Sequence, residues 1–394
     1  MLTVLCLLGF WVTPTESPVV ENGLNPKSKP ITLVLSEDLR IGPDDGGSEY
    51  TWSGQNTAVH PDKDGRMFVV DTGGSRILLF DREGKFVQQI GGPGTGPGEF
   101  NGLRSMVVLE QGGLMALEYL QNAGLIVHFD KNLAFQKEVD LAIQDARLDS
   151  ARFSYDGRWL FGTSNSLNPE RTAIVYTEFL MNDKLVAEHE ILTYTRAPFN
   201  GERATDPDYW RDYLAEAISG FAKGQNSFGA FDRNGLMYTA VASKYEVDVW
   251  DKTGKKIRTF KREYKPIVQT KEEVNAIVDP IFENVRSQIT EEMRKVFTRS
   301  VAEGAVAKAN FPPVKNPIFG LTVMENGMIL VIHDRNIVDN TETADIFDRE
   351  GRFLGSYKHP STALSQMQFL NGYAYTVEPG GGKFSLVRYK VKIQ

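Results

Sequence analysis

A short unit that recurs along the chain constrains its fold more than any other feature. The unit is an apolar strand that ends in an aromatic residue, an Asp, two polar residues, a Gly and a second apolar strand. It is clearest in ILLFDREGKFVQQIG at residues 77–91, and it returns at 249–260, 346–357 and, more weakly, 128–139. Alternating apolar residues on both sides of the turn indicate paired antiparallel strands. Self-similarity at a period of about 40 residues is typical of four-stranded propeller blades.

Six blade-like units follow one another, at residues 54–91, 103–141, 147–192, 225–262, 317–357 and 362–393. Asx-Gly pairs separate the first two strands of several units, and they stand at 64–65, 156–157, 234–235, 326–327 and 371–372. Such pairs favour tight hairpins, because Gly and Asn tolerate positive φ. The sequence therefore predicts an all-β, six-bladed propeller over residues 31–394.

The ends of the chain are expected to meet in one blade. The last unit supplies only three strands, and the apolar segment ITLVL at 31–35 has no partner in its own neighbourhood. A strand from one terminus that completes the blade at the other removes two exposed sheet edges. We therefore expect residues 31–35 to close the ring, and residues 1–30 to be a signal or an unstructured segment.

The first unit resembles the repeat of the NHL-type six-bladed propellers. The resemblance is carried by Val70-Asp71, by the aromatic-Asp-x-x-Gly turn at 80–84, by Ile90-Gly91 and by the loop GTGPGEF at 94–100. The turns at 250–254 and 347–351 match in part, and the remaining units match through their spacing alone. The resemblance implies a propeller that serves ligand or protein binding more often than one particular reaction.

Two segments interrupt the blade rhythm, at residues 193–224 and 265–316. The second is helical by pattern, with a capping box at Thr270 and Glu273 and apolar residues at helical spacing. Pro280 is expected to kink or restart the helix, and Gly304 with the pair at 312–313 to end it. Both insertions join the outermost strand of one blade to the innermost strand of the next. All such connections emerge on one face, so the insertions should lie side by side over one mouth of the channel.

Three interpretations fit this helical face. The helix packs its apolar stripe on a blade edge, it forms a lid over a ligand site, or it is a surface for a protein partner or a second copy. Tyr209, Trp210 and Tyr213 favour the binding interpretations because Tyr and Trp are enriched at recognition surfaces. Core packing explains these aromatic residues equally well.

Charge and cysteine content narrow the partners. The formal net charge is −7, which gives no electrostatic reason to expect nucleic acid or an anionic membrane surface. The single cysteine, Cys6, makes no internal disulfide and leaves no Cys-based zinc site. Five histidines are scattered, and His60 is the one near the end of a first strand. No cofactor is expected.

The apolar run at 1–12 resembles the hydrophobic region of a secretory signal, although a basic region before it is missing. It is too short for a transmembrane helix, and no later segment qualifies. We interpret the chain as extracytoplasmic, secreted or periplasmic. An apolar N-terminal strand, or an artefact of gene calling, is the other interpretation.

The channel-facing ends of the first strands offer amides and arginines, namely Gln55, Asn56, Arg104, Arg152, Asn226 and Gln366. Calcium requires several anionic or carbonyl oxygens. Because we find no Asp or Glu ahead of the apolar core of a first strand, this set is a poor calcium cage. Arg104 and Arg152 stand at equivalent places in their units, which predicts an anion-accepting channel mouth; solvated or internally paired arginines are the alternative.

The sequence thus favours a non-catalytic propeller that binds a protein or a small-molecule ligand on the face with the two insertions. The alternative is a metal-dependent hydrolase or lyase with its site in the central channel. The residues predicted to bind the ligand are Asn56, Arg104, Arg152, Asn226, Tyr209 and Trp210.

Overall fold

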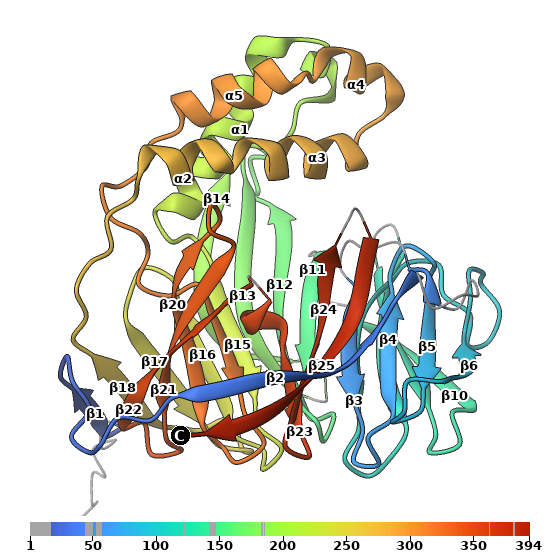
Figure 1. The fold of residues 1–394 in the computed structure, drawn as a ribbon. Coiled ribbons are helices and arrows are strands. Elements are labelled where there is room, and N and C mark those ends of the chain that lie inside the picture. Colours follow the sequence, from blue (N-terminus) through green and yellow to red (C-terminus); the bar gives the residue numbers. More distant parts are fainter. Residues whose placement is uncertain are drawn as a thin grey trace, which may run out of the picture.

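Six sheets, built mainly of antiparallel strands, stand around a common axis, and a layer of helices lies over part of one face of the ring (Figure 1). The computed structural model describes residues 17–43, 50–52, 57–120, 123–141, 147–182, 184, 186–361, 363–380 and 383–394. Each sheet is a blade whose strands follow chain order from the inside outward, with two exceptions, each an outermost strand that comes from the N-terminal part of the chain.

The first three blades are continuous in sequence. Blade 1 contains β3 (Ala58–Pro61), β4 (Met67–Asp71), β5 (Arg76–Phe80) and β6 (Phe86–Ile90). Blade 2 contains β7 (Leu103–Val108), β8 (Leu114–Leu120), β9 (Ala123–Phe129) and β10 (Phe135–Leu141). Blade 3 contains β11 (Arg147–Phe153), β12 (Trp159–Leu167), β13 (Ile174–Asn182) and β14 (Ala187–Arg196).

The other three blades complete the ring. Blade 4 contains β15 (Ser227–Phe231), β16 (Met237–Val241), β17 (Glu246–Trp250) and β18 (Lys256–Arg262). Blade 5 contains β19 (Gly320–Val323), β20 (Ile329–Asn336), β21 (Thr341–Phe347) and β22 (Phe353–His359). Blade 6 contains β23 (Gln368–Leu370), β24 (Tyr373–Gly380), β25 (Lys383–Ile393) and, from the other end of the chain, β2 (Leu33–Ile41).

The predicted ring closure is confirmed. β2 pairs antiparallel with β25, from Leu33 opposite Ile393 to Ile41 opposite Leu386, and so forms the outermost strand of blade 6. The strand is longer than the expected segment 31–35 and contains a bulge between Glu37 and Leu39. This pairing covers the edge that β25 would otherwise expose.

The expectation of an unstructured segment up to residue 30 is wrong for one stretch. The strand β1 (Val19–Asn22) runs parallel to β18 and adds a fifth strand to the outer edge of blade 4. Asn22 then contacts blade 5, where its Nδ2 donates to the Gly351 carbonyl at 2.9 Å and its Oδ1 accepts from the Phe353 amide at 2.8 Å. Further along, the Ile31 amide donates to the Leu354 carbonyl at 3.0 Å. The segment from β1 to β2 thus connects the outer edges of blades 4, 5 and 6.

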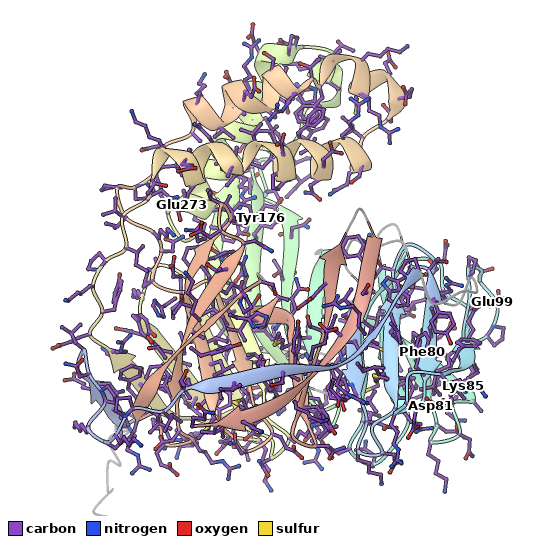
Figure 2. All side chains as sticks on the ribbon, in the orientation of Figure 1. Phe80, Asp81, Lys85, Glu99, Tyr176 and Glu273 are labelled. Atoms are coloured by element: carbon purple, nitrogen blue, oxygen red, sulfur yellow. The ribbon has the colours of Figure 1, made fainter. Side chains whose placement is uncertain are left out.

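The recurrent Asp shapes the outer hairpins of blades 1, 2 and 4. Asp81 follows β5, and its Oδ1 accepts hydrogen bonds from the amides of Glu83 and Lys85 at 3.1 and 2.8 Å (Figure 2). Asp130 and Asp251 accept equivalent pairs of bonds in blades 2 and 4. Gly84 completes this turn at φ 87°, a conformation that glycine adopts without a steric cost. The repeated motif is therefore a turn in which the side chain of the Asp binds the amides that the hairpin leaves without partners.

The core is divided among the interfaces between blades. In the described residues, an apolar cluster lies between each pair of neighbouring blades, and a seventh lies within the helical layer. Figure 1 shows the helices above the part of the ring that contains blades 3 to 5. They are α1 (Pro207–Ala222), α2 (Lys271–Ala276), α3 (Val278–Gln288), α4 (Glu291–Val296) and α5 (Arg299–Lys308).

The second insertion is several helices rather than one kinked helix. The predicted capping box at Thr270 and Glu273 opens α2, and the helix restarts at Val278, just before Pro280. Gly304 was expected to end the helical segment, and this prediction is wrong, because Gly304 lies inside α5. A Cβ atom there would come within 2.7 Å of Cδ of Arg211 on α1, so the glycine allows these two helices to approach closely. The two insertions thus form one layer, here called the lid.

Candidate functional site

A cavity of about 450 Å³ lies between the lid and the propeller. Fourteen residues line it, and ten of them are apolar. They are Leu214, Ala217, Ile218, Phe221, Ala222, Gln269, Ile277, Ile281, Asn284, Val285, Phe311, Lys315, Asn316 and Phe319. The walls therefore come from α1, from α3 and the residues that flank α2, and from the segment that leads into β19. Binding pockets for small molecules have this character, being mostly apolar with few polar groups and about 300–1,000 Å³ in volume.

The helical periodicity of the second insertion explains one side of this wall. Ile277, Ile281 and Val285 recur at intervals of four residues and so share one face of the helix. On the other side of the cavity, Leu214, Ile218 and Phe221 share one face of α1 through spacings of four and three residues. Neither helix fills the space between these faces, and the cavity remains there.

Lys315 anchors the lid at the base of the cavity. Its buried ammonium forms ion pairs with Glu273 of α2 and, at 2.7 Å, with Asp334 of β20; it also donates to the Arg335 carbonyl at 3.3 Å. Burial disfavours the charged ammonium, but the hydrogen bonds to Asp334 and Glu273 outweigh it and raise the pKa of Lys315. Glu273 is labelled at the foot of the helices in Figure 2. Lys315 thus joins the lid to blade 5 through two carboxylates.

A second contact fixes the cavity wall at Phe221. The guanidinium of Arg196, the last residue of β14, lies 4.4 Å from the centroid of the Phe221 ring and 5.1 Å from that of Tyr194. Such contacts between a cation and an aromatic face are attractive. The Phe221 carbonyl also accepts a hydrogen bond of 2.9 Å from Asn316, another residue of the cavity wall. Phe221 is thereby held from both sides.

The far end of the central channel, away from the lid, is crossed by side chains. Tyr155 lies in the turn between β11 and β12, and its hydroxyl donates to Oε1 of Gln368 at 2.9 Å. These residues belong to blades 3 and 6, which stand opposite each other in the ring. Arg233 of blade 4 lies over the Tyr155 ring at 4.2 Å and pairs with Glu110 of blade 2 at 2.5 Å. Four of the six blades thus contribute to this crossing.

Of the predicted channel residues, Arg152 is the one whose surroundings the structure defines best. It is exposed to solvent within the channel, and its Nη1 donates to the Gly229 carbonyl of blade 4 at 3.4 Å. The charge of Arg152 also acts on His60 of blade 1. Burial, and then the charges of Arg152 and Arg233, lower the pKa of His60 to about 4.

The expected equivalence of Arg104 and Arg152 is wrong. Arg152 is next to the last residue of β11 and close to the turn that precedes β12, whereas Arg104 is the second residue of β7. Counted back from the turn, Val107 is the residue of blade 2 that matches Arg152. Arg104 therefore lies toward the lid side of the channel and Arg152 toward the opposite side. Asn226 precedes β15 on the lid side, and its carbonyl accepts from the Ala242 amide at 2.9 Å. Asn56 lies outside the described residues.

Tyr209 and Trp210 are buried in the lid. Trp210 is 3% exposed, packs in the lid core and donates from its indole nitrogen to the Ala204 carbonyl at 2.8 Å. The Tyr209 hydroxyl accepts from the Asn200 amide. These contacts give the two residues a packing role and leave the cavity wall to others. Lys315 and Tyr155 could not be predicted from the sequence, because no local pattern marks either residue.

The expectation that no first strand has an acidic residue ahead of its apolar core is wrong for blade 3. β11 begins at Arg147, so it includes Asp149 ahead of its apolar end, and one first strand does carry an acidic residue there. Among the residues that the structure describes, no group of three or more His, Cys, Asp or Glu side chains could hold a metal ion. Within the same part of the chain, the helices are too short or too polar to cross a membrane.

Comparisons with known proteins agree with this geometry. A family described as 6-bladed beta-propeller matches residues 60–201. The fold is a six-bladed β-propeller. A protein of Bacteroides fragilis NCTC 9343 described as exported is similar to this propeller, with a TM-score of 0.51 and 12% identity over 95% of this chain and 99% of that one.

A second solved structure is similar to the propeller to the same degree. It is a member of the duf4221 family from Bacteroides vulgatus atcc 8482, with a TM-score of 0.50 and 10% identity over 92% of this chain and 98% of that one. At these identities the likeness shows the fold alone. No curated protein matches the sequence.

Proposed function

We propose that this propeller is a non-catalytic binding protein that holds a small apolar molecule in the cavity under the lid. The observation that carries the proposal is the cavity itself, with its volume of about 450 Å³ and its ten apolar residues out of fourteen. Burial of apolar ligand surface there contributes about 25 cal/mol per Å² removed from water. The polar atoms of Gln269, Asn284 and Asn316 can orient the ligand.

A small molecule fits this site better than a peptide or a second protein. Protein interfaces of standard size bury about 800 Å² on each partner, which calls for a broad surface. Here the apolar residues of α1 and α3 face each other across a partly open cavity of about 450 Å³, and Phe221 is the one exposed large hydrophobic residue of the cavity wall. The shape and the lining together favour a compact apolar ligand.

Binding of the neutral fluorophore N-phenylnaphthylamine tests this function. The intact protein should enhance its fluorescence saturably. An Ala217→Trp variant, which fills the cavity, should weaken binding by at least about tenfold, since core sites accept little added volume. Ala307→Trp, on the exposed side of α5, is the matched control and should bind as the unchanged protein does. Equal affinity in the two variants would show that the fluorophore binds elsewhere, and would overturn the proposal.

We also propose that the protein works outside the cytoplasm. The apolar run at 1–12 supports export, as does the likeness to a propeller described as exported. Fractionation of the producing cells, with mass spectrometry of the mature N-terminus, tests it. Recovery in the envelope or the medium with the run removed is the expected result, and an intact chain in the cytoplasm would contradict it.

A further inference from the structure

The central channel contains a cationic group that the protein leaves largely unused. Arg152 has five N–H donors and makes a single hydrogen bond to the described residues, the 3.4 Å bond to Gly229. Three partly buried arginines outside the first strands of the blades are paired with carboxylates: Arg262 with Asp345, Arg335 with Glu342, and Arg388 with Asp38. Arg152 has no such partner in the described part of the chain. An arginine in an enclosed position usually needs an anion to offset its lost hydration.

The position of Arg152 is enclosed although solvent reaches it. The surrounding protein disfavours the charged form and lowers the pKa of its guanidinium. On the side of the channel away from the lid, the Tyr155–Gln368 hydrogen bond crosses the axis next to it. Arg152 is therefore a positive charge beside the place where side chains of opposite blades meet across the channel.

A second arginine adds to the positive potential. Nη1 of Arg233 forms an ion pair with Glu110, while its Nε is buried without a hydrogen-bond partner. The nearby carboxylate of Asp232 accepts from the amides of Asn234 and Leu236 in its own turn. The two acids near the arginines are thus already engaged.

The lowered pKa of His60 shows that the electrostatic potential near Arg152 is positive. After burial, the charges that act on it are those of Arg152 and Arg233, and both lower its pKa. At neutral pH its imidazole is therefore uncharged, and it can donate one hydrogen bond. Tyr155 is neutral as well, because burial raises its pKa.

We propose that the channel, in addition to the lid cavity, is a binding site for a small oxyanion, a carboxylate or a phosphate, held by the guanidinium of Arg152. Planar guanidinium groups bind both kinds of anion through paired N–H donors. Arg233 supplies further positive potential, and His60 supplies a neutral donor. The site lies on the channel axis, apart from the apolar cavity, so its occupancy is independent of the fluorophore described above.

The test is a titration of the intact protein with inorganic phosphate and with succinate, followed by calorimetry and by NMR of the His60 ring. A His60→Gln variant assigns the resonance. Saturable binding of either anion is expected, and it should raise the pKa of His60 above about 4, because the anion offsets the two arginine charges. Chloride at the same ionic strength should leave that pKa unchanged. The tighter of the two anions identifies the ligand as a phosphate or a carboxylate.

Arg152→Gln should weaken anion binding about tenfold or more, the value of one charge-assisted hydrogen bond. Arg158→Gln is the matched control, since Arg158 lies in the same turn region but is exposed and beside Asp156. The NMR titration of the unchanged protein needs no variant, so it stands even where Arg152→Gln folds poorly. Absence of saturable binding by both anions, or equal binding in the two arginine variants, would overturn the proposal.

Discussion

The hydroxyl of Tyr155 donates a hydrogen bond of 2.9 Å to Gln368, and the two residues come from opposite blades of the ring. This bond ties blade 3 to blade 6 across the axis, independently of the contacts between neighbouring blades. Tyr155→Phe removes the donor and keeps the ring that packs under Arg233. We expect a loss of about 1 kcal/mol in the free energy of unfolding, measured by urea denaturation.

Tyr213→Phe is the control for this variant. Tyr213 packs in the lid core, and the described residues give its hydroxyl no hydrogen bond, so its free energy of unfolding should stay within about 0.5 kcal/mol of the unchanged protein. Equal losses in the two variants would mean that the bond across the axis does not stabilise the ring.

Replacing the lid anchor should cost much more. Lys315→Met leaves the carboxylates of Glu273 and Asp334 without their cation in a mostly buried place. Removing one partner of a buried ion pair costs about 3–5 kcal/mol. Hydrogen exchange should show the amides of α2 opening before those of the blades. Lys308→Met removes an exposed pair with Asp212 and should cost less than about 1 kcal/mol. A loss of less than about 1 kcal/mol in Lys315→Met as well would show that the ion pairs of Lys315 do not stabilise the lid.

The stability that the anchor supplies should depend on pH in two windows. Burial opposes ionisation of Glu273, but its bonds to Lys315 and Thr270 hold its pKa below the ordinary value of 4.5. Its share is therefore present above that value and is lost as pH falls through the folded pKa. The pKa of Lys315 lies above 10.5, so its share is lost as pH rises through that higher value.

The difference in free energy of unfolding between the unchanged protein and Lys315→Met isolates this effect. It should form a plateau between about pH 5 and pH 10 and shrink on both sides. A difference that stays constant from pH 3 to pH 11 would contradict the assignment of the charges.

The strand β1 should stabilise the propeller through one side chain. Asn22 donates to the carbonyls of Lys261 and Gly351 at 3.0 and 2.9 Å, and it accepts from the Phe353 amide at 2.8 Å. Because Asn22→Ala removes three bonds, of which two bridge to blade 5, we expect a loss of about 1–3 kcal/mol, read from the thermal midpoint. The neighbouring Glu21→Ala, on an exposed position, should leave the midpoint unchanged. Matching midpoints for the two variants would show that β1 does not hold blades 4 and 5 together.

The frame of the molecule could be predicted from sequence because its signals are local. Asp81 binds amides two and four residues later, and the same short-range chemistry recurs at Asp130 and Asp251. Such turns fix where each hairpin folds. With six blades counted, the last one lacks a fourth strand, and an exposed edge strand is unfavourable. The position of β2 in blade 6 could therefore be predicted.

The features that sequence did not reveal depend on long-range geometry. Asn22 meets Lys261 and Gly351 across 239 and 329 residues, and Tyr155 meets Gln368 across 213. The difference between Arg104 and Arg152 arises from the number of residues that separate each from its turn, and irregular pairing near Leu103 and Leu148 obscures that number. The cavity is a gap between two helix faces, and each face alone looks like ordinary packing.

The strand β1 also gives the molecule an orientation. Ser17, just before it, donates to the carbonyl of Lys256 at the start of β18, and β1 lies at the bottom of Figure 1 while the lid lies at the top. A protein held to a surface through its leading residues would therefore rest on the side away from the helices. The lid would then lie on the outward side, from which a ligand arrives by diffusion.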